Sequence, residues 1–600
     1  MADPGNDRPT NGAVWLQPVT LPDLAEWVRN GLALQAMLID FQAERMTGPA
    51  AERLLSPADG SGPLARLFDS LPFARLRRRQ VADALQLGQV LLGQLGIGPM
   101  AARDGAPAGL ARRDARFADR KWRAHPLHVL IHQAYLLWSE RLLLLVDEVP
   151  GLDANRREQL RFAARTVAEA LSPANFATTN PVVVERTLAS KGANLVTGLK
   201  HLLRDVRRGQ ITHTDPDAFA VGRDIATTPG KVVHQTALYQ LIHYTPTTPE
   251  VMTTPLVIFP PWINRFYILD LNEKKSLVRW LLDNGVSVFM VSWKSADASI
   301  ADVTADDYVK AQIDAIDHVR QRLQVPSANA VGYCVAGSHL AMALALLARR
   351  GEADKVRSAT FFTAQVDFEN AGELKLLIDE QPLAMMDRLA KGGSFDGRYM
   401  SATFNLLRSS DLIWQYVIDH YLLGKDYRAF DLLHWNGDTT NLPWKWHKEY
   451  LTTLYRDNRM VEPNSLTIDG TPIDLTRIET PAYVQAGRED HIAPPESVWR
   501  MNRHFKGPLR FVLAGSGHIA GVVNPPAGGK YQYWTNPAKV ATFEDFVEGA
   551  VETKGSWWPN WLEWLRQQDS STVPATGKRA PGGRGDRVIE DAPGRYVLTR

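Results

Sequence analysis

The stretch ANAVGYCVAGSHLAMALALL, residues 328–347, decides the expected fold because it runs from a buried strand straight into a helix through Cys334. Cys334 is the only cysteine in 600 residues. Gly332 and Gly337 stand on either side of it and allow the sharp bend that such a junction requires. A thiol at the start of a helix gains thiolate stability from the unpaired N–H groups and the helix dipole. The stretch therefore predicts a strand-to-helix turn that presents a nucleophile.

Six compact apolar runs predict the strands of a sheet around this turn. Most are continuous rather than alternating, as expected of parallel strands buried on both faces, and helical segments such as DDYVKAQIDAIDHVRQRL separate several of them. The pattern predicts an α/β unit with a mostly parallel sheet and helices on both faces. The runs are PLVIFPP (255–261), GVSVFMVSW (285–293), ANAVGYC (328–334), VRSATFFTAQVDF (356–368), PAYVQAG (481–487) and LRFVLAG (509–515).

The rest of the chain has a different character. From residue 21 to about 208, apolar residues recur at helical spacing, which predicts an all-α domain over residues 1–215. The catalytic domain is expected at 216–570, with a helical cap inserted at about 372–459 between the fourth and fifth runs. The last segment, 571–600, is rich in Pro, Gly and Arg and is predicted to be a loosely held tail.

Composition excludes some function classes. The net charge is only +2, so there is no general electrostatic reason to expect binding to nucleic acid or to an anionic membrane. The single cysteine and the absence of an apolar stretch behind a basic start favour a cytoplasmic location. The longest stretch without Lys, Arg, Asp or Glu, residues 323–348, contains proline and several polar residues, so we expect no transmembrane segment.

Two residues downstream complete a candidate triad with Cys334. Asp490 lies in VQAGREDHIAPP and His518 in FVLAGSGHIAGVVNPP, each just after a predicted strand. Nucleophile, acid and histidine then follow in the chain order that this kind of strand-to-helix turn requires. Separately, a buried cysteine, a turn aspartate and a loop histidine are each commonplace. Together, in this order, they favour a Cys-His-Asp triad.

A thiol in place of a serine hydroxyl points to acyl transfer. An ordinary thiol is already a few per cent thiolate at neutral pH, and a histidine in hydrogen-bond reach activates it easily. If the acyl donor is itself a thioester, its transfer to Cys334 is nearly isoenergetic and keeps the driving force for attack by an alcohol. Hydrolysis does not require this driving force to be kept.

With these residues in place, the chain resembles the class I polyhydroxyalkanoate synthases, members of the α/β-hydrolase superfamily that polymerise short 3-hydroxyacyl-CoA. The resemblance extends over most of the chain. The segments that carry it are RFADRKWRAHP, SPANFATTNP, VGRDIATTPGKVV, PPWINRFYILDL, VSWKSADAS, GYCVAGS, LRSSDLIWQYVIDHYL, FDLLHWNGDTTNLP, GREDHIAP, GSGHIAGVVNPP and GSWWPNWLEWL.

The resemblance implies an α/β-hydrolase fold in which Cys334 is acylated and His518 is the general base. Asp490 either orients His518 or helps it to activate the 3-hydroxyl of the incoming monomer. The family's box reads Gly-x-Cys-x-Gly-Gly, whereas Ala336 replaces the middle glycine here, so we expect a slightly tighter turn. Neither a metal nor a cofactor beyond the CoA thioester substrate is expected.

The tetrahedral intermediate needs N–H donors for its oxyanion. The fold supplies one from the residue after the nucleophile, Val335, and one from an earlier loop, where PPWIN offers Ile263 or, as a second choice, Trp262. The alternative is that this loop only packs the Trp262 side chain. Arg408 and His491 are candidates for contacts with CoA, with a surface ion pair as the alternative for Arg408. The segment HWNGDTTN is expected to support the cap rather than to perform chemistry.

Two other functions stay open at this point. An acyl-CoA thioesterase-like cysteine hydrolase would use water in place of the hydroxyl, and a non-catalytic granule-associated scaffold would use no chemistry at all. The resemblance favours the polymerase and implies a growing polyester chain as partner, a homodimer, granule-coating proteins, and a place at the surface of polyester granules in the cytoplasm.

Overall fold

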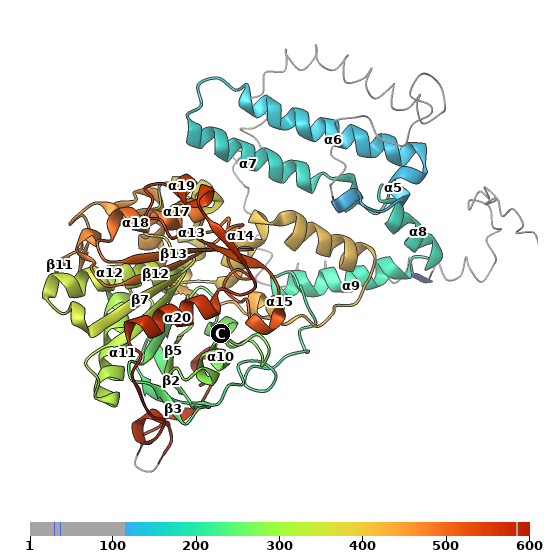
Figure 1. Ribbon diagram of the computed structural model, residues 1–600. Coiled ribbons are helices and arrows are strands. Elements are labelled where there is room, and N and C mark those ends of the chain that lie inside the picture. The colour runs from blue at the N-terminus through green and yellow to red at the C-terminus, as the bar shows by residue number, and fades with distance from the viewer. Residues whose placement is uncertain (1–28, 31–36, 38–114, 584–585, 600) are drawn as a thin grey trace, which may run out of the picture. The chain divides into compact units, whose positions relative to one another are not determined.

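The computed structural model describes residues 29–30, 37, 115–583 and 586–599, and these form two compact units (Figure 1). A helical unit contains the described residues up to Ile211 together with Arg408–Tyr427. A catalytic unit contains Thr212–Leu407 and the described residues from Arg428 onward.

The helical unit is built on α6 (Pro126–Asp147) and α7 (Ala154–Ala170), which pack side by side (Figure 1). Small and branched side chains on the two helices, among them Val146 and Ala164, form a buried cluster between them. The remaining α-helices described here are α5 (Lys121–Ala124), α8 (Pro181–Ala189) and α9 (Ala193–Arg208). The expected all-α character is confirmed for residues 115–208, while the rest of the region predicted to be helical, apart from residues 29–30 and 37, lies outside the described residues.

Helix α6 is long and apolar enough to cross a membrane by length and composition, and within the described part of the chain it is the one helix that passes this test. Half of its most apolar window is buried inside the protein, and core helices of soluble proteins pass the same test.

Residues 408–427 lie within the predicted cap but pack with the helical unit instead. They form two π-helical segments, η8 (Ser410–Trp414) and η9 (Val417–Leu422), and η9 runs against α9. The approach is close because Gly198 on α9 has no side chain; a Cβ there would lie 1.8 Å from the carbonyl oxygen of Tyr421. The amide of Asn194 also donates to Leu422 O at 2.7 Å. The cap insertion is thus split between the two units.

The catalytic unit contains an 11-stranded sheet in the described residues, in the order β15-β14-β13-β12-β7-β6-β4-β5-β2-β1-β17. Its centre is parallel, and antiparallel strands extend it at both ends. The parallel strands are β4 (Leu256–Phe259), β5 (Val288–Trp293), β6 (Ala328–Tyr333), β7 (Val356–Phe362), β12 (Ala482–Gly487) and β13 (Leu509–Ala514). The antiparallel strands are β1 (Gly230–Gln235), β2 (Tyr239–Tyr244), β14 (Gln532–Thr535), β15 (Val551–Lys554) and β17 (Glu590–Asp591).

Helices cover the sheet as the continuous apolar runs require. Residues of α10 (Leu277–Asp283) and α20 (Trp558–Gln568) join alternate strand residues such as Ile258 in one core cluster. Helices α11 (Ala305–Leu323) and α12 (Val335–Arg350) contact β4, β6 and β7. Cap helices occupy the connection between β7 and β12: α13 (Glu380–Leu389), α14 (Gly397–Leu407), α15 (Asp431–Gly437) and α16 (Trp444–Glu449).

The expected fold class is confirmed, since each of the six apolar runs contains one of the six parallel strands. The antiparallel strands were not predicted. Polar residues interrupt sequences such as GKVVHQ and YQLIHY, so these strands lack the continuous apolar runs from which the parallel strands were predicted.

The C-terminal segment is not a loose tail, and that prediction was wrong. Strand β16 (Thr572–Pro574) pairs with β3 (Glu250–Met252), and β17 extends the central sheet beside β1. Tyr596 and Val597 are buried. The buried guanidinium of Arg265 donates to Tyr596 O at 3.3 Å and to Thr599 O at 2.7 Å. Backbone carbonyls at specific places, which composition does not reveal, hold this segment.

We expect removal of residues 590–600 to lower the free energy of unfolding of the catalytic unit by at least about 3 kcal/mol, because buried Arg265 then loses two acceptors. Denaturant unfolding followed by tryptophan fluorescence measures the change. Tyr596→Phe, which removes only the hydroxyl bond to Thr236 O, is the matched mild variant and should cost about 1 kcal/mol. Equal stability of the shortened and full chains would contradict this role.

Candidate active site

Cys334 stands at a strained turn between β6 and α12. Its backbone angles are φ 54° and ψ −126°, a conformation that L-residues rarely adopt and that is tolerated where surrounding structure enforces it. Its N–H donates to Phe362 O on the neighbouring strand β7 at 2.9 Å, and its carbonyl accepts from Gly337 N at 2.9 Å. The side chain is only partly buried. The turn therefore holds the thiol at the edge of the sheet.

Two glycines make the turn possible by direct contact. A Cβ on Gly332 would lie 2.5 Å from Gly337 Cα, and a Cβ on Gly337 would lie 2.4 Å from Ala364 Cβ. Ala336, which replaces the family's middle glycine, is fully buried, and its carbonyl accepts from the Gln312 side chain at 2.9 Å. The first and last positions of the box thus require glycine, whereas the middle one accommodates a methyl group.

The structure brings His518 and Asp490 together. Asp490 follows β12 and His518 follows β13, which are adjacent parallel strands, so both residues leave the same edge of the sheet. Nδ1 of His518 lies 2.7 Å from Oδ2 of Asp490. The other carboxylate oxygen, Oδ1, accepts the backbone N–H groups of Ile492 and Ala493, both at 2.9 Å. Both side chains are buried.

The electrostatics of His518 tie it to Cys334. Burial acts to lower the pKa of His518, but the charges of Asp490 and Cys334 and hydrogen bonds to both side chains raise that pKa well above its usual value. Tyr333, next to Cys334, donates its hydroxyl to His518 O at 3.0 Å and so helps to hold the histidine loop in place. The arrangement favours the protonated form of the His518 imidazole.

The two predicted oxyanion donors lie at the same edge of the sheet as Cys334. Val335 is the first residue of α12, where a helix has no acceptor of its own for the N–H. Ile263 lies in the loop after β4, and β4 pairs with β6 with Phe259 opposite Gly332. Trp262, the second choice, is buried, and its ring stacks on Tyr308 with centroids 3.9 Å apart.

The candidate CoA contacts lie in different places. Arg408 belongs to the helical unit, where its exposed guanidinium forms an ion pair with Asp411. His491 is partly buried and directly follows Asp490. Both contacts remain predictions. Within the described part of the chain, no three His, Cys, Asp or Glu side chains are grouped so as to hold a metal ion.

Sequence reasoning missed two tyrosines of the cap. Tyr450 and Tyr455 are fully surrounded by protein, and burial, together with the charge of Cys334, raises the pKa of each well above its usual value. Gln365 donates to the Tyr455 hydroxyl at 3.3 Å. Burial and the charge of Cys334 thus both favour the protonated form of these two tyrosines. Their helical pattern carries no signal of this, because it is that of any buried helix face.

The fold and site define an α/β-hydrolase with a cysteine at the nucleophile position. The alpha/beta hydrolase fold family matches residues 254–525, and the family described as poly-beta-hydroxybutyrate polymerase (PhaC) N-terminus matches residues 113–281. The latter match spans the end of the helical unit and the start of the catalytic unit.

Curated relatives match this chain over most of its length. The chain is 43% identical to the poly(3-hydroxyalkanoate) polymerase subunit PhaC of Rhizobium meliloti (strain 1021) over 82% of this chain and 81% of that protein. It is 42% identical to the subunit PhaC of Cupriavidus necator over 81% of this chain and 83% of that protein. Identity to the poly(3-hydroxyalkanoate) polymerase of Methylorubrum extorquens is also 42%, over 81% of this chain and 80% of that protein. The chain belongs to the poly(3-hydroxyalkanoate) polymerase family.

Gly337→Ala should distort the turn, because the new methyl group would meet Ala364 Cβ, which has no flexible end to move. We expect a loss of about 1–3 kcal/mol in unfolding free energy, the usual cost of overpacking. The matched control is Ala336→Gly one residue away, which should cost about 1 kcal/mol or less. Thermal unfolding of both variants checks the order, and a larger loss for Ala336→Gly would contradict the contact.

Asp490→Asn removes the main charge that raises the pKa of His518. A histidine with a raised folded pKa contributes stability that is fully present below its unfolded pKa of about 6.5 and is lost as pH rises through the folded value. The difference in unfolding free energy between wild type and variant should therefore be largest near pH 6 and smaller near pH 9. Urea unfolding across this range measures it, and a difference that grows with pH would refute the assignment.

Proposed function

We propose that the chain polymerises (R)-3-hydroxyacyl-CoA, with 3-hydroxybutyryl-CoA as the first candidate, into a polyester with release of CoA. The single observation that carries the proposal is the buried His518–Asp490 pair, at the same edge of the sheet as Cys334, and the identity of 43% to a curated polymerase supports it.

The proposed reaction alternates two acyl transfers at Cys334. The thiolate attacks the thioester carbonyl of the substrate, the tetrahedral intermediate collapses, and CoA leaves as its thiolate, which takes the proton held on His518. The acyl group is then a thioester of Cys334. In elongation, the 3-hydroxyl of an incoming 3-hydroxyacyl-CoA attacks the thioester carbonyl of the chain on Cys334, His518 accepts the hydroxyl proton, and Cys334 leaves as its thiolate. The lengthened chain, now a CoA thioester, is transferred back to Cys334 by the first step, and CoA leaves with the proton held on His518. An ester bond forms, a thioester bond breaks, and no redox step or cofactor is needed.

Asp490 is proposed to orient His518 rather than to activate the hydroxyl itself. Oδ2 of Asp490 forms a hydrogen bond with Nδ1 of His518, and Oδ1 accepts hydrogen bonds from the backbone N–H groups of Ile492 and Ala493. A carboxylate whose two oxygens already accept from protein donors holds the ring in place and stabilises its protonated form.

Val335 N and Ile263 N are the proposed donors to the oxyanion, and His491 and Arg408 the proposed contacts with CoA. The single cysteine supports a cytoplasmic location. Assembly as a homodimer, contact with granule-coating proteins and a place at the surface of polyester granules rest on the family resemblance.

The test is turnover of a panel of 3-hydroxyacyl-CoA thioesters by the purified chain, with CoA release and polymer measured together. We expect Cys334→Ser and His518→Gln each to lower kcat by at least about 10³-fold, as loss of a triad member does. Release of CoA with only free hydroxy acid as product would indicate a thioesterase. No CoA release by the wild type would leave a non-catalytic role.

A further inference from the structure

The loop after β4, residues 260–266, is held by hydrogen bonds to its carbonyl groups. Trp293 Nε1 donates to Pro260 O at 2.8 Å, and Trp435 Nε1 donates to Arg265 O at 2.7 Å. Asn264 forms an antiparallel bridge with Thr439 of the cap. The segment HWNGDTTN, expected to support the cap, therefore also forms hydrogen bonds with the loop that carries Ile263.

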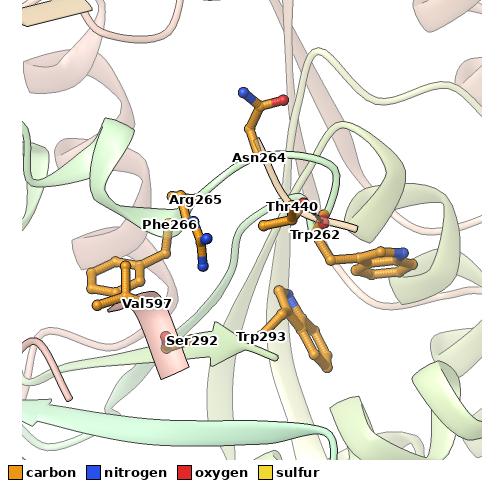
Figure 2. A pocket seen from close by; sticks show the side chains of 8 residues that line it. All are labelled: Trp262, Asn264, Arg265, Phe266, Ser292, Trp293, Thr440 and Val597. Atoms are coloured by element: carbon orange, nitrogen blue, oxygen red, sulfur yellow. Dashed lines mark hydrogen bonds between the residues drawn. The ribbon is translucent and has the colours of Figure 1, made fainter. Parts of the chain in front are cut away.

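Thr440 makes the central contact between this segment and the loop. Its Oγ1 lies 2.6 Å from Trp262 O and 2.7 Å from Ile263 O, so its one proton is shared between the two carbonyls. Thr440 is 3% exposed. Thr440 lines a small cavity of about 10 Å³ together with Arg265 and Trp293. Figure 2 shows Thr440 beside Trp262.

The hydrogen bond from Thr440 to Trp262 O also determines the direction of the Ile263 N–H, because both groups belong to the same peptide unit. In a planar trans peptide the C=O and the N–H point in opposite directions. A hydrogen bond that fixes the direction of Trp262 C=O therefore fixes the direction of Ile263 N–H. The N–H concerned is the proposed second donor to the oxyanion.

The same peptide is anchored on the side of the nucleophile. The ring of Trp262 packs edge-on against His339, with centroids 4.8 Å apart. His339 lies on α12, and its Nδ1 is 2.9 Å from the carbonyl of Val335, the residue of the first donor. Trp446 of the cap donates its Nε1 to His339 Nε2 at 3.0 Å. The loop is thus fastened to both the helix of Cys334 and the cap.

We propose that Thr440 is a positioning residue for the acyl transfer, because its hydroxyl holds the Trp262–Ile263 peptide so that Ile263 N–H is directed at the oxyanion. The inference rests on the proposed function and assigns the cap a share in the chemistry. Thr440 acts through Ile263 and does not touch the reacting atoms. Its contribution belongs to the tetrahedral intermediate and not to the bound thioester.

The test compares Thr440→Val, which keeps the shape and removes the hydroxyl, with Thr440→Ser, which keeps the hydroxyl. Steady-state CoA release from 3-hydroxybutyryl-CoA by the full chain should show kcat lowered about 10- to 100-fold in Thr440→Val, less than the roughly 10²–10³-fold loss on removing a donor outright. KM should change less than about threefold, because the ground-state complex is unaffected. Thr440→Ser should recover most of kcat.

Thr254→Val is the matched control. Thr254 is also buried and donates its hydroxyl to Asp569 Oδ2 at 2.6 Å, but it precedes β4 and so lies at the opposite end of the parallel strands. We expect a similar fall in melting temperature with unchanged kcat. If Thr440→Val does not fold at the assay temperature, Thr440→Ala takes its place with the same expected loss of kcat.

The outcomes separate the two proposals. An active wild type with kcat within twofold in Thr440→Val, or Thr440→Ser as impaired as Thr440→Val, overturns the role of Thr440 and leaves the polymerase standing. A rise in KM at constant kcat also overturns it, since that would be a role in substrate binding. A wild type that releases no CoA from any hydroxyacyl thioester overturns both.

Discussion

The contact between Gly332 and Gly337 is the constraint on which the rest of the site depends. It allows α12 to start directly against the end of β6, and this forces Cys334 into a backbone conformation that few residues adopt. The strain is tolerated because Cys334 N–H and C=O both remain hydrogen-bonded. Everything else, from the histidine loop to the oxyanion donors, is arranged around a sulfur atom whose position this contact fixes.

The centre of the fold was accessible from the sequence because buried parallel strands leave a strong signal. Runs such as VFMVSW have no polar face, and residues that follow such strands must meet at one edge of the sheet, as Asp490 and His518 do. The outer strands and the C-terminal segment were not accessible. Their places depend on single long-range contacts, such as Arg265 with Thr599 O, which composition and periodicity do not encode.

The candidate site also has a part that could be predicted from the sequence and a part that could not. The identity of the candidate nucleophile, acid and base follows from chain order and strand ends. The role of Thr440 could not be inferred in this way, because it arises from one hydroxyl meeting two carbonyls 177 and 178 positions earlier in the chain. Hydrogen bonds to backbone carbonyls depend on the conformation of the acceptor, and a loop such as PPWIN has no periodic pattern from which that conformation could be inferred.

The division of the insertion has a consequence for dissecting this protein. The polypeptide passes between the two units three times, after Ile211, after Leu407 and after Tyr427. Ile418 and Leu423 belong to a buried apolar cluster with Phe117 and Trp122. A fragment that begins at Thr212 would keep Ile418 and Leu423 but lose Phe117 and Trp122. The apolar side chains of Ile418 and Leu423 would then lose these packing partners. Residues 115–211 and 408–427 belong to one unit, so a cut before Thr212 divides that unit instead of separating two units.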